Sequence, residues 1–378
     1  MGKVGRTAVV LGIVALAWLL RARAVQMLPV DYDEDDYLRA AQDMAEVIRA
    51  GEWGDLRELN LRPVHPPLAK FMFGLAIAGL PPVEKVPDRP YLPGPAASLP
   101  QPHLDVARYS AALLGTLEVL LLAILNPLGA FFLAIHTWTI KYTSQVMLEA
   151  LPAFTSAAAV MSYERARICD VSERKWGWLL LSAVFLGLTA AAKYVYALAG
   201  IAILIHWAWV CISGTSGRGR RLLRWLGQAL AWGLLSIALF FLFNPYLWPD
   251  PVNRLADSIF GNVLFSRSTY VQEAGLPPYQ AFIWLIQSVP WHPGVFLLPL
   301  DFLIFVLTIL GLRRLWRDWL LYAIWLFTAF VFLFLWPTKW PQYVLVLTFP
   351  LCLSAALGFT AVIWEPLRSW WERRATRS

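Results

Sequence analysis

The sequence contains little cysteine and little charge. Its 378 residues include three cysteines, and Lys, Arg, Asp and Glu together make up 15% of the chain. Cys169, Cys211 and Cys352 have neither metal-ligand nor disulfide spacing, which argues against a disulfide scaffold or a redox centre. Alternating strand patterns and internal repeats are also missing. These absences oppose a membrane β-barrel and a transporter built from two similar halves.

Apolar sequence is abundant instead. Hydrophobic residues make up 58% of the chain, and the mean hydropathy is +0.55. Ten stretches span, or nearly span, a bilayer, at about 7–25, 106–125, 127–141, 147–162, 176–192, 195–212, 225–243, 294–312, 319–336 and 343–364. A spanning helix needs roughly 20 residues, and lipid forces backbone polar groups to pair within helices. We therefore expect an all-α polytopic membrane protein with about ten transmembrane helices, forming a single membrane-embedded domain over residues 1–378.

The positive charge indicates how these helices are oriented. The formal net charge is +7, and basic residues concentrate in short loops at 165–175, 218–224 and 313–317 and in the tail. Because basic loops stay in the cytoplasm, we interpret this charge as a topology signal and not as nucleic-acid binding. Both termini are then cytoplasmic, and the membrane is the plasma (inner) membrane. A first outer loop at 26–105 is expected to carry interfacial helices, and the outer loop at 244–293 is compatible with a mobile lid.

An acidic cluster follows the first apolar segment. Five carboxylates fall within residues 31–37. Carboxylates in the first turn of a helix stabilise the helix dipole, which accounts for Asp35 and Asp36. Asp33 and Glu34 stand at or before the expected helix start, so we interpret them as catalytic or binding residues at the outer water edge of the membrane.

Three further ionisable residues border apolar helices. On the expected topology, Glu149, Lys193 and Lys339 fall at outer helix ends. A buried charge there is costly. Lysines that snorkel to the interface, and pairing of Glu149 with a nearby cation, are the alternatives to a functional role. Because all three lie on the side of the acidic cluster, we predict a shared site whose cations bind an anionic lipid head group.

Five motifs carry a family resemblance. They are Asp33-Glu34-x-x-Tyr37, His65-Pro66-Pro67-Leu68-Ala69-Lys70, Met147-Leu148-Glu149, the segment Gly187 to Lys193-Tyr194, and Thr338-Lys339-Trp-Pro-Gln-Tyr343. The first four resemble, in order, elements of the protein O-mannosyltransferases, and the last is similar to a Lys-x-x-x-Tyr segment of the lipid A aminoarabinose transferases. Glu149 stands where the family has aspartate, and no β-rich insert separates the later helices. The resemblance implies the GT-C fold and a sugar donor carried on polyprenyl phosphate.

The resemblance also implies a mechanism. It predicts an inverting glycosyltransferase that moves a hexose, mannose-like, to an acceptor hydroxyl of a protein, lipid or glycan on the outer face. Asp33 is expected to be the general base, and Lys193, Lys339 and Arg267 are expected to stabilise the leaving phosphate. The other residues expected to bind substrate or to position Asp33 are Glu34, Tyr37, Glu149, Tyr343, Lys70 and His65. No cofactor is expected, with His65 as a metal ligand kept as an alternative to a structural histidine.

Two other functions remain open. A transporter or flippase would also place charges inside a helical bundle, although here the charges are expected at one face and not near the midplane. A non-catalytic subunit that binds a lipid-linked sugar would differ from the enzyme mainly at Asp33.

Overall fold

The computed structural model describes residues 3–87, 94–169, 171–213 and 218–375, and this part of the chain is helical without a β-strand. The ends of the expected domain 1–378, and residues 88–93 of the expected loop 26–105, lie outside the described residues. The longer helices are α1 (Lys3–Met27), α2 (Glu34–Ala50), α3 (Leu68–Ile77), α4 (His103–Leu125), α7 (Ala150–Ile168), α8 (Ser172–Ala192), α9 (Leu198–Ser213), α10 (Arg218–Leu242), α11 (Pro251–Ser266), α14 (Asp301–Asp318), α15 (Leu320–Leu335), α16 (Leu345–Phe359) and α17 (Glu365–Ala375). The shorter elements are α5 (Pro127–Ile135), α6 (Thr137–Tyr142), α12 (Thr269–Glu273), α13 (Gln280–Ile286), the 3-10 turns η1 (Trp53–Arg57), η2 (Ala96–Ser98), η3 (Tyr194–Ala197), η4 (Pro245–Leu247) and η5 (Pro341–Val344), and the π-helical turn η6 (Thr360–Trp364).

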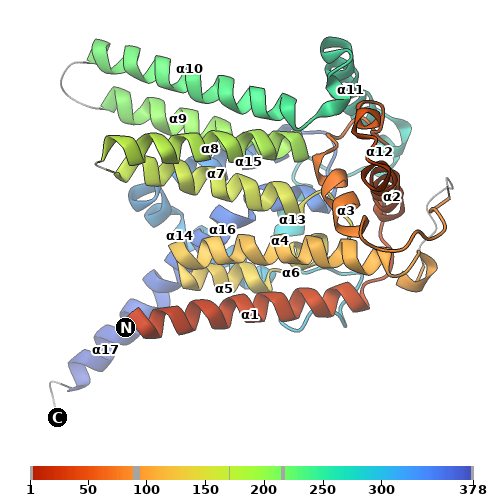
Figure 1. Ribbon diagram of the computed structural model, residues 1–378. Helices are drawn as coiled ribbons and strands as arrows, with labels where there is room; N and C mark the ends of the chain where they lie inside the picture. The colour runs from red at the N-terminus through yellow and green to blue at the C-terminus, as the bar shows by residue number, and fades with distance from the viewer. Residues whose placement is uncertain (1–2, 88–93, 170, 214–217, 376–378) are drawn as a thin grey trace.

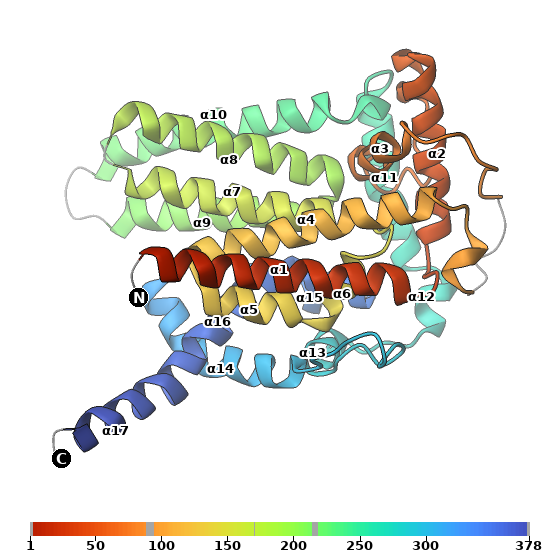
Figure 2. The ribbon, with the colours of Figure 1, turned by 60° about the horizontal axis from the view of Figure 1, so that its bottom comes forward.

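The bundle has two unlike ends. Helices α1, α4, α7, α8, α9 and α10 run side by side, whereas α2, α3, α11 and α12 gather beyond one end of them (Figure 1). Both termini lie at the opposite end, where α17 extends away from the bundle (Figure 2). The acidic cluster and the termini are therefore on opposite sides. This arrangement is compatible with the expected topology, in which the termini share one side of the membrane.

Six helical segments are long and apolar enough to cross a membrane among the described residues. They are Val4–Met27, His103–Leu125, Glu173–Ala192, Tyr194–Ser213, Trp225–Leu242 and Pro341–Arg374. The protein is thus an integral membrane protein, but ten spans are not confirmed.

Two expected spans differ from the structure. Residues 127–141 form two short helices, because Asn126 and His136 each accept a hydrogen bond from a backbone N–H three residues on and so begin a new helix. The stretch expected at 294–312 becomes helical only at Asp301, whose carboxylate accepts hydrogen bonds from the Thr137 N–H at 2.9 Å and from the Ser288 hydroxyl at 2.6 Å. In both places local polar contacts decide the helix boundary against the apolar pattern.

Helices α14 and α16 cross at close range. A Cβ at Gly311 would lie 1.9 Å from the carbonyl oxygen of Ser354, and a Cβ at Gly358 would lie 2.0 Å from that of Leu307. Only glycine permits such backbone approach between membrane helices. The crossing fixes α16, which begins directly after the Tyr343 turn η5 and so helps to position that residue.

Candidate active site

Asp33 stands in the turn before α2 and lies next to a cation that the sequence analysis did not single out. Its backbone is left-handed, with φ at 68°, and its carboxylate accepts a hydrogen bond from the Arg62 guanidinium. The Asp33 side chain is 22% exposed. Burial raises the pKa of Asp33 above its usual value, while the charges of Arg62 and, further away, Lys193 lower it. The carboxylate is therefore partly enclosed and faces two cations.

Glu34 fixes the start of α2 from inside the protein. Its two carboxylate oxygens accept hydrogen bonds from Nε and from the second terminal nitrogen of Arg108, both at 2.7 Å, and both side chains are fully buried. Arg108 also donates to the carbonyl of Leu28 at 2.8 Å, and Glu34 accepts from the Val146 N–H at 2.9 Å. This bidentate pair ties α2 to α4 and to the ends of neighbouring segments. The structure therefore places Glu34 as a support for its neighbour Asp33.

Glu149 and Lys193 form a second buried pair. The Lys193 ammonium bonds to Oε1 of Glu149, and their side chains are 7% and 1% exposed. The same ammonium lies 5.3 Å from the ring centroid of Tyr343, a favourable cation–π distance. Oε2 of Glu149 is buried and has no hydrogen-bond partner among the described residues. Since buried polar atoms are normally paired, this oxygen is an open acceptor inside the site.

Tyr37 and His65 join these groups. Their ring centroids are 6.5 Å apart in an edge-on arrangement. Burial and the nearby carboxylates of Asp33 and Glu149 raise the pKa of Tyr37 well above its usual range, so Tyr37 is a hydrogen-bond donor there. Burial and the cations around it, Lys193 first, keep the pKa of His65 well below its usual range, so this imidazole is neutral. The part of the chain that the structure describes holds no group of three His, Cys, Asp or Glu side chains arranged for a metal ion.

Lys70 is buried behind the loop that carries His65. Its ammonium donates to the carbonyls of Leu61 at 2.7 Å and His65 at 3.1 Å, and to the side-chain oxygen of Asn60. These bonds hold the loop before α3 in shape. In this structure Lys70 therefore supports the site from behind.

Lys339 and Arg267 do not join the cluster in this structure. The Lys339 ammonium donates to the carbonyls of Leu333 at 2.6 Å and Phe334 at 2.9 Å, at the C-terminal end of α15. Arg267 is exposed at the end of α11. Among the described residues, no hydrogen bond or ion pair joins either side chain to Asp33, Glu149 or Lys193.

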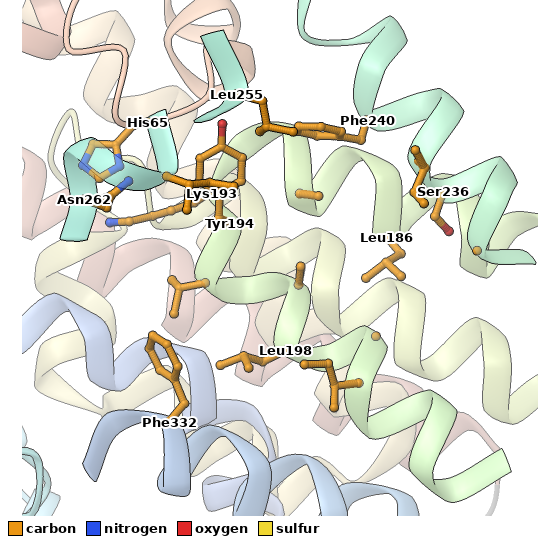
Figure 3. Close-up of a pocket in the computed structure, with 18 of the residues that line it drawn as sticks. His65, Leu186, Lys193, Tyr194, Leu198, Ser236, Phe240, Leu255, Asn262 and Phe332 are labelled. Atoms are coloured by element: carbon orange, nitrogen blue, oxygen red, sulfur yellow. The ribbon is translucent and has the colours of Figure 1, made fainter. Parts of the chain in front are cut away.

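A cavity of about 650 Å³ opens beside this cluster. Its walls come mainly from α8, η3, α9, α10 and α11, and most of the lining is apolar. Figure 3 shows His65, Lys193 and Asn262 close together at one end, with Leu186, Leu198 and Phe332 further along. Tyr343 also lines the cavity. The cavity thus combines an apolar body with a polar end that carries one lysine, an arrangement that suits an amphiphilic anion.

Sequence reasoning missed three site residues, Arg62, Arg108 and Lys141. The buried ammonium of Lys141 pairs with the carboxylate of Asp31. It also donates to Gln145 at 3.2 Å. Arg108 and Lys141 each lie within a mostly apolar segment, and such isolated charges signal a buried partner. Arg62 had no comparable signal, because nothing in its spacing indicates a contact with Asp33.

Comparison with known proteins identifies the fold. No protein-family model and no curated protein matches the chain. ArnT from Cupriavidus metallidurans, solved bound to undecaprenyl phosphate, is similar with a TM-score of 0.64 and 16% identity over 98% of this chain and 62% of that one. The apo state of the same protein gives a TM-score of 0.63 and 18% identity over 97% of this chain and 62% of that one.

A weaker similarity is to a protein O-mannosyltransferase complex of S. cerevisiae bound to the sugar donor. Its TM-score is 0.47, with 20% identity over 64% of this chain and 34% of that one. The chain spans 62% of the length of the ArnT structures, and identities this low establish the fold alone. The chain has the GT-C fold of polytopic membrane glycosyltransferases, as its motifs predicted.

Proposed function

We propose that the protein is an inverting glycosyltransferase that moves a sugar from a polyprenyl-phosphate carrier to an acceptor hydroxyl. The observation that carries the proposal is the apolar cavity of about 650 Å³ whose polar end holds Lys193. The charge of Lys193 acts on Asp33, so a phosphate bound there would lie near a carboxylate base. A carrier lipid has the matching chemistry, with an apolar chain for the cavity and a phosphate for its polar end.

In the proposed reaction, Asp33 removes the proton from the acceptor hydroxyl as that oxygen attacks the anomeric carbon. The bond from the anomeric carbon to the phosphate oxygen breaks on the opposite face, which inverts the configuration. The leaving group is already an anion, so cations suffice to stabilise it, and Lys193 is placed for this role. The open oxygen of Glu149 accepts a hydrogen bond from a sugar hydroxyl. Lys339 and Arg267 contribute in this proposal only if donor binding draws them to the phosphate.

The finer parts of the proposal rest on the motif resemblance. We propose a hexose, mannose-like, as the sugar, and a protein, lipid or glycan as the acceptor. The site end of the bundle faces outward, and both termini face the cytoplasm of a plasma (inner) membrane. The opposite placement of the termini and α2 (Figure 1) and the basic loops support this orientation.

The cavity provides the first test, through two glycines of α10. Gly233 lines the cavity, and neither Gly233 nor Gly227 has an atom within 4 Å of an added Cβ. Gly233→Leu should fill part of the cavity and weaken undecaprenyl-phosphate binding about tenfold, the loss expected for ~1.4 kcal/mol of apolar contact. Gly227→Leu, on the same helix away from the cavity, should bind normally. Equal affinity of the two variants for this lipid would argue against the cavity as the carrier site.

The pH dependence of transfer provides a second test. A general base works only when it is deprotonated, and burial raises the pKa of Asp33. We therefore expect transfer to be lost as pH falls through this raised pKa, above the usual range of an aspartate. Because the Arg62 charge lowers the pKa of Asp33, Arg62→Ala should move the acid limb of kcat/KM, which reports the free enzyme, to higher pH. If the acid limb stays at the same pH in this variant, a group other than Asp33 causes the loss of rate.

The function itself is tested by the lipid product. Purified protein, given an undecaprenyl-phosphate sugar and membrane acceptor material, should release sugar-free undecaprenyl phosphate, detected by mass spectrometry. Donor binding without release would support a non-catalytic subunit, and movement of intact donor across a vesicle membrane would support a flippase.

A further inference from the structure

Arg62 forms an ion pair with Asp33, the carboxylate that the proposed reaction requires as its base. One terminal nitrogen of its guanidinium bonds to Asp33 and the other to Asp36, one turn on in α2. The Arg62 side chain is 43% exposed, so it reaches across the surface of the site. A carboxylate held by a guanidinium is stabilised in its charged form and is a weaker base. Proton removal by Asp33 therefore needs this contact to loosen.

The backbone on both sides of this contact is unusual. Among the described residues, Asp33 and Arg62 are the only non-glycine residues with positive φ, at 68° and 56°. An arginine in this region is strained, and such strain persists only where the surroundings enforce it. The two residues with this backbone face each other in the ion pair. The conformation of Arg62 therefore depends on the contacts that hold its loop.

The loop that carries Arg62 is held from two sides. We call residues 57–65 the strap. On one side Lys70 of α3 bonds to the strap carbonyls described above. On the other side, Asn262 of α11 donates to the Val64 carbonyl at 2.6 Å, and Arg254 of α11 donates to Glu58 at 2.7 Å. The strap is thus fastened between a buried lysine and one wall of the cavity.

The same wall and the strap both face the cavity. Ile259, Asn262 and Val263 of α11 line it, and so does His65 of the strap. A lipid that fills the cavity therefore contacts α11 and the strap together. Its phosphate, beside Lys193 and His65, lies on the same side of the site as Arg62, whose charge acts on His65. The phosphate would offer Arg62 a competing anion.

We propose that Arg62 guards the catalytic carboxylate and is displaced by substrate. While the cavity is empty, its guanidinium holds Asp33 and Asp36. When a lipid phosphate enters the polar end, the guanidinium transfers to the phosphate, which frees Asp33 to accept the proton of the acceptor hydroxyl and adds a second cation to the leaving group. This inference rests on the proposed function. It makes the base available only when the donor is bound.

The test is chemical modification of Asp33, read by peptide mass spectrometry after reaction with a water-soluble carbodiimide and an amine. This reaction uses the protonated carboxyl, which an ion pair disfavours. Without lipid, the reagent should modify Asp33 several-fold faster in Arg62→Gln and in Arg62→Ala than in wild type. Lys85→Ala is the matched control. Lys85 bridges two carboxylates of α2, Asp43 and Glu46, just as Arg62 bridges Asp33 and Asp36. In this control, Asp33 should be modified at the wild-type rate.

Undecaprenyl phosphate supplies the second arm. It should speed modification of Asp33 in wild type and have no such effect in Arg62→Gln. If wild type binds the lipid but its Asp33 is modified at an unchanged or slower rate, the proposed guard role of Arg62 is wrong. It is also wrong if the lipid speeds modification of Asp33 equally in Arg62→Gln. Failure of wild type to bind the lipid would overturn the proposed function instead, while the comparison without lipid would still decide whether Arg62 shields Asp33. Thermal unfolding in detergent checks that each variant is folded.

Discussion

Asp33→Asn is expected to lower the rate of sugar transfer by about 10²–10⁴-fold, the usual contribution of a general base. The amide keeps the size of the side chain but cannot accept the acceptor proton. The buried supports of the site, the Glu34–Arg108 and Glu149–Lys193 pairs, do not involve Asp33. Donor binding should therefore survive, and single-turnover transfer together with a lipid-binding assay separates the two effects.

Asp43→Asn is the matched control for this prediction. Asp43 lies on α2, the helix that Asp33 precedes, and it pairs with Lys85. Its side chain is 27% exposed, close to the 22% of Asp33. Its replacement should leave transfer unchanged. An Asp33→Asn protein that transfers sugar within tenfold of wild type would remove Asp33 from the role of base.

Arg108→Ala is expected to cost roughly 3–5 kcal/mol of folding free energy, the loss typical of breaking a buried ion pair. The change leaves the fully buried carboxylate of Glu34 with only backbone N–H donors. It also removes the donors to the carbonyls of Val25 and Leu28, so the end of α1 and the start of α2 lose a shared anchor. Thermal unfolding in a mild detergent measures the effect.

Two variants sharpen this second prediction. Arg317→Ala removes a surface pair with Asp318 in which the arginine is 73% exposed, and it should leave the unfolding temperature nearly unchanged because water screens such a pair. The double variant Glu34→Met with Arg108→Met should recover much of the stability, since apolar replacement of a buried pair is often neutral. Equal losses for Arg108→Ala and Arg317→Ala would contradict the structural role of the buried pair.

The long apolar helices were predictable from sequence because length and hydropathy decide whether a segment spans lipid. The breaks at His136 and before Asp301 were not, because each depends on a side-chain hydrogen bond within an apolar stretch. A pattern of apolar residues does not predict such hydrogen bonds. These breaks fall in two of the four expected spans that are not among the six candidate membrane helices of the described residues.

The candidate site was predictable where motifs carried it. Tyr37, His65, Glu149, Lys193 and Tyr343 gather beside Asp33, and each belongs to one of the five motifs. Lys339 bonds instead to carbonyls at the end of α15. Sequence reasoning did not predict these partners, because a flexible lysine near a helix end can bond either to backbone carbonyls or to a buried site.

The contact between Arg62 and Asp33 could not be predicted from the sequence. This contact depends on two left-handed residues and on a strap fastened by Lys70 and Asn262. These are tertiary conditions that residue spacing does not reveal. The guard is consequently an inference that only the structure supports.

The measurement that tests the central claim most directly is transfer of label from a panel of radiolabelled polyprenyl-phosphate sugars into membrane acceptor material. Purified wild type and Asp33→Asn would be compared at equal, measured donor occupancy. The account predicts that wild type moves label from at least one donor, with a mannose-type sugar foremost, and that Asp33→Asn binds the same donor without moving it. Donor that binds to both proteins and is transferred by neither would contradict the account.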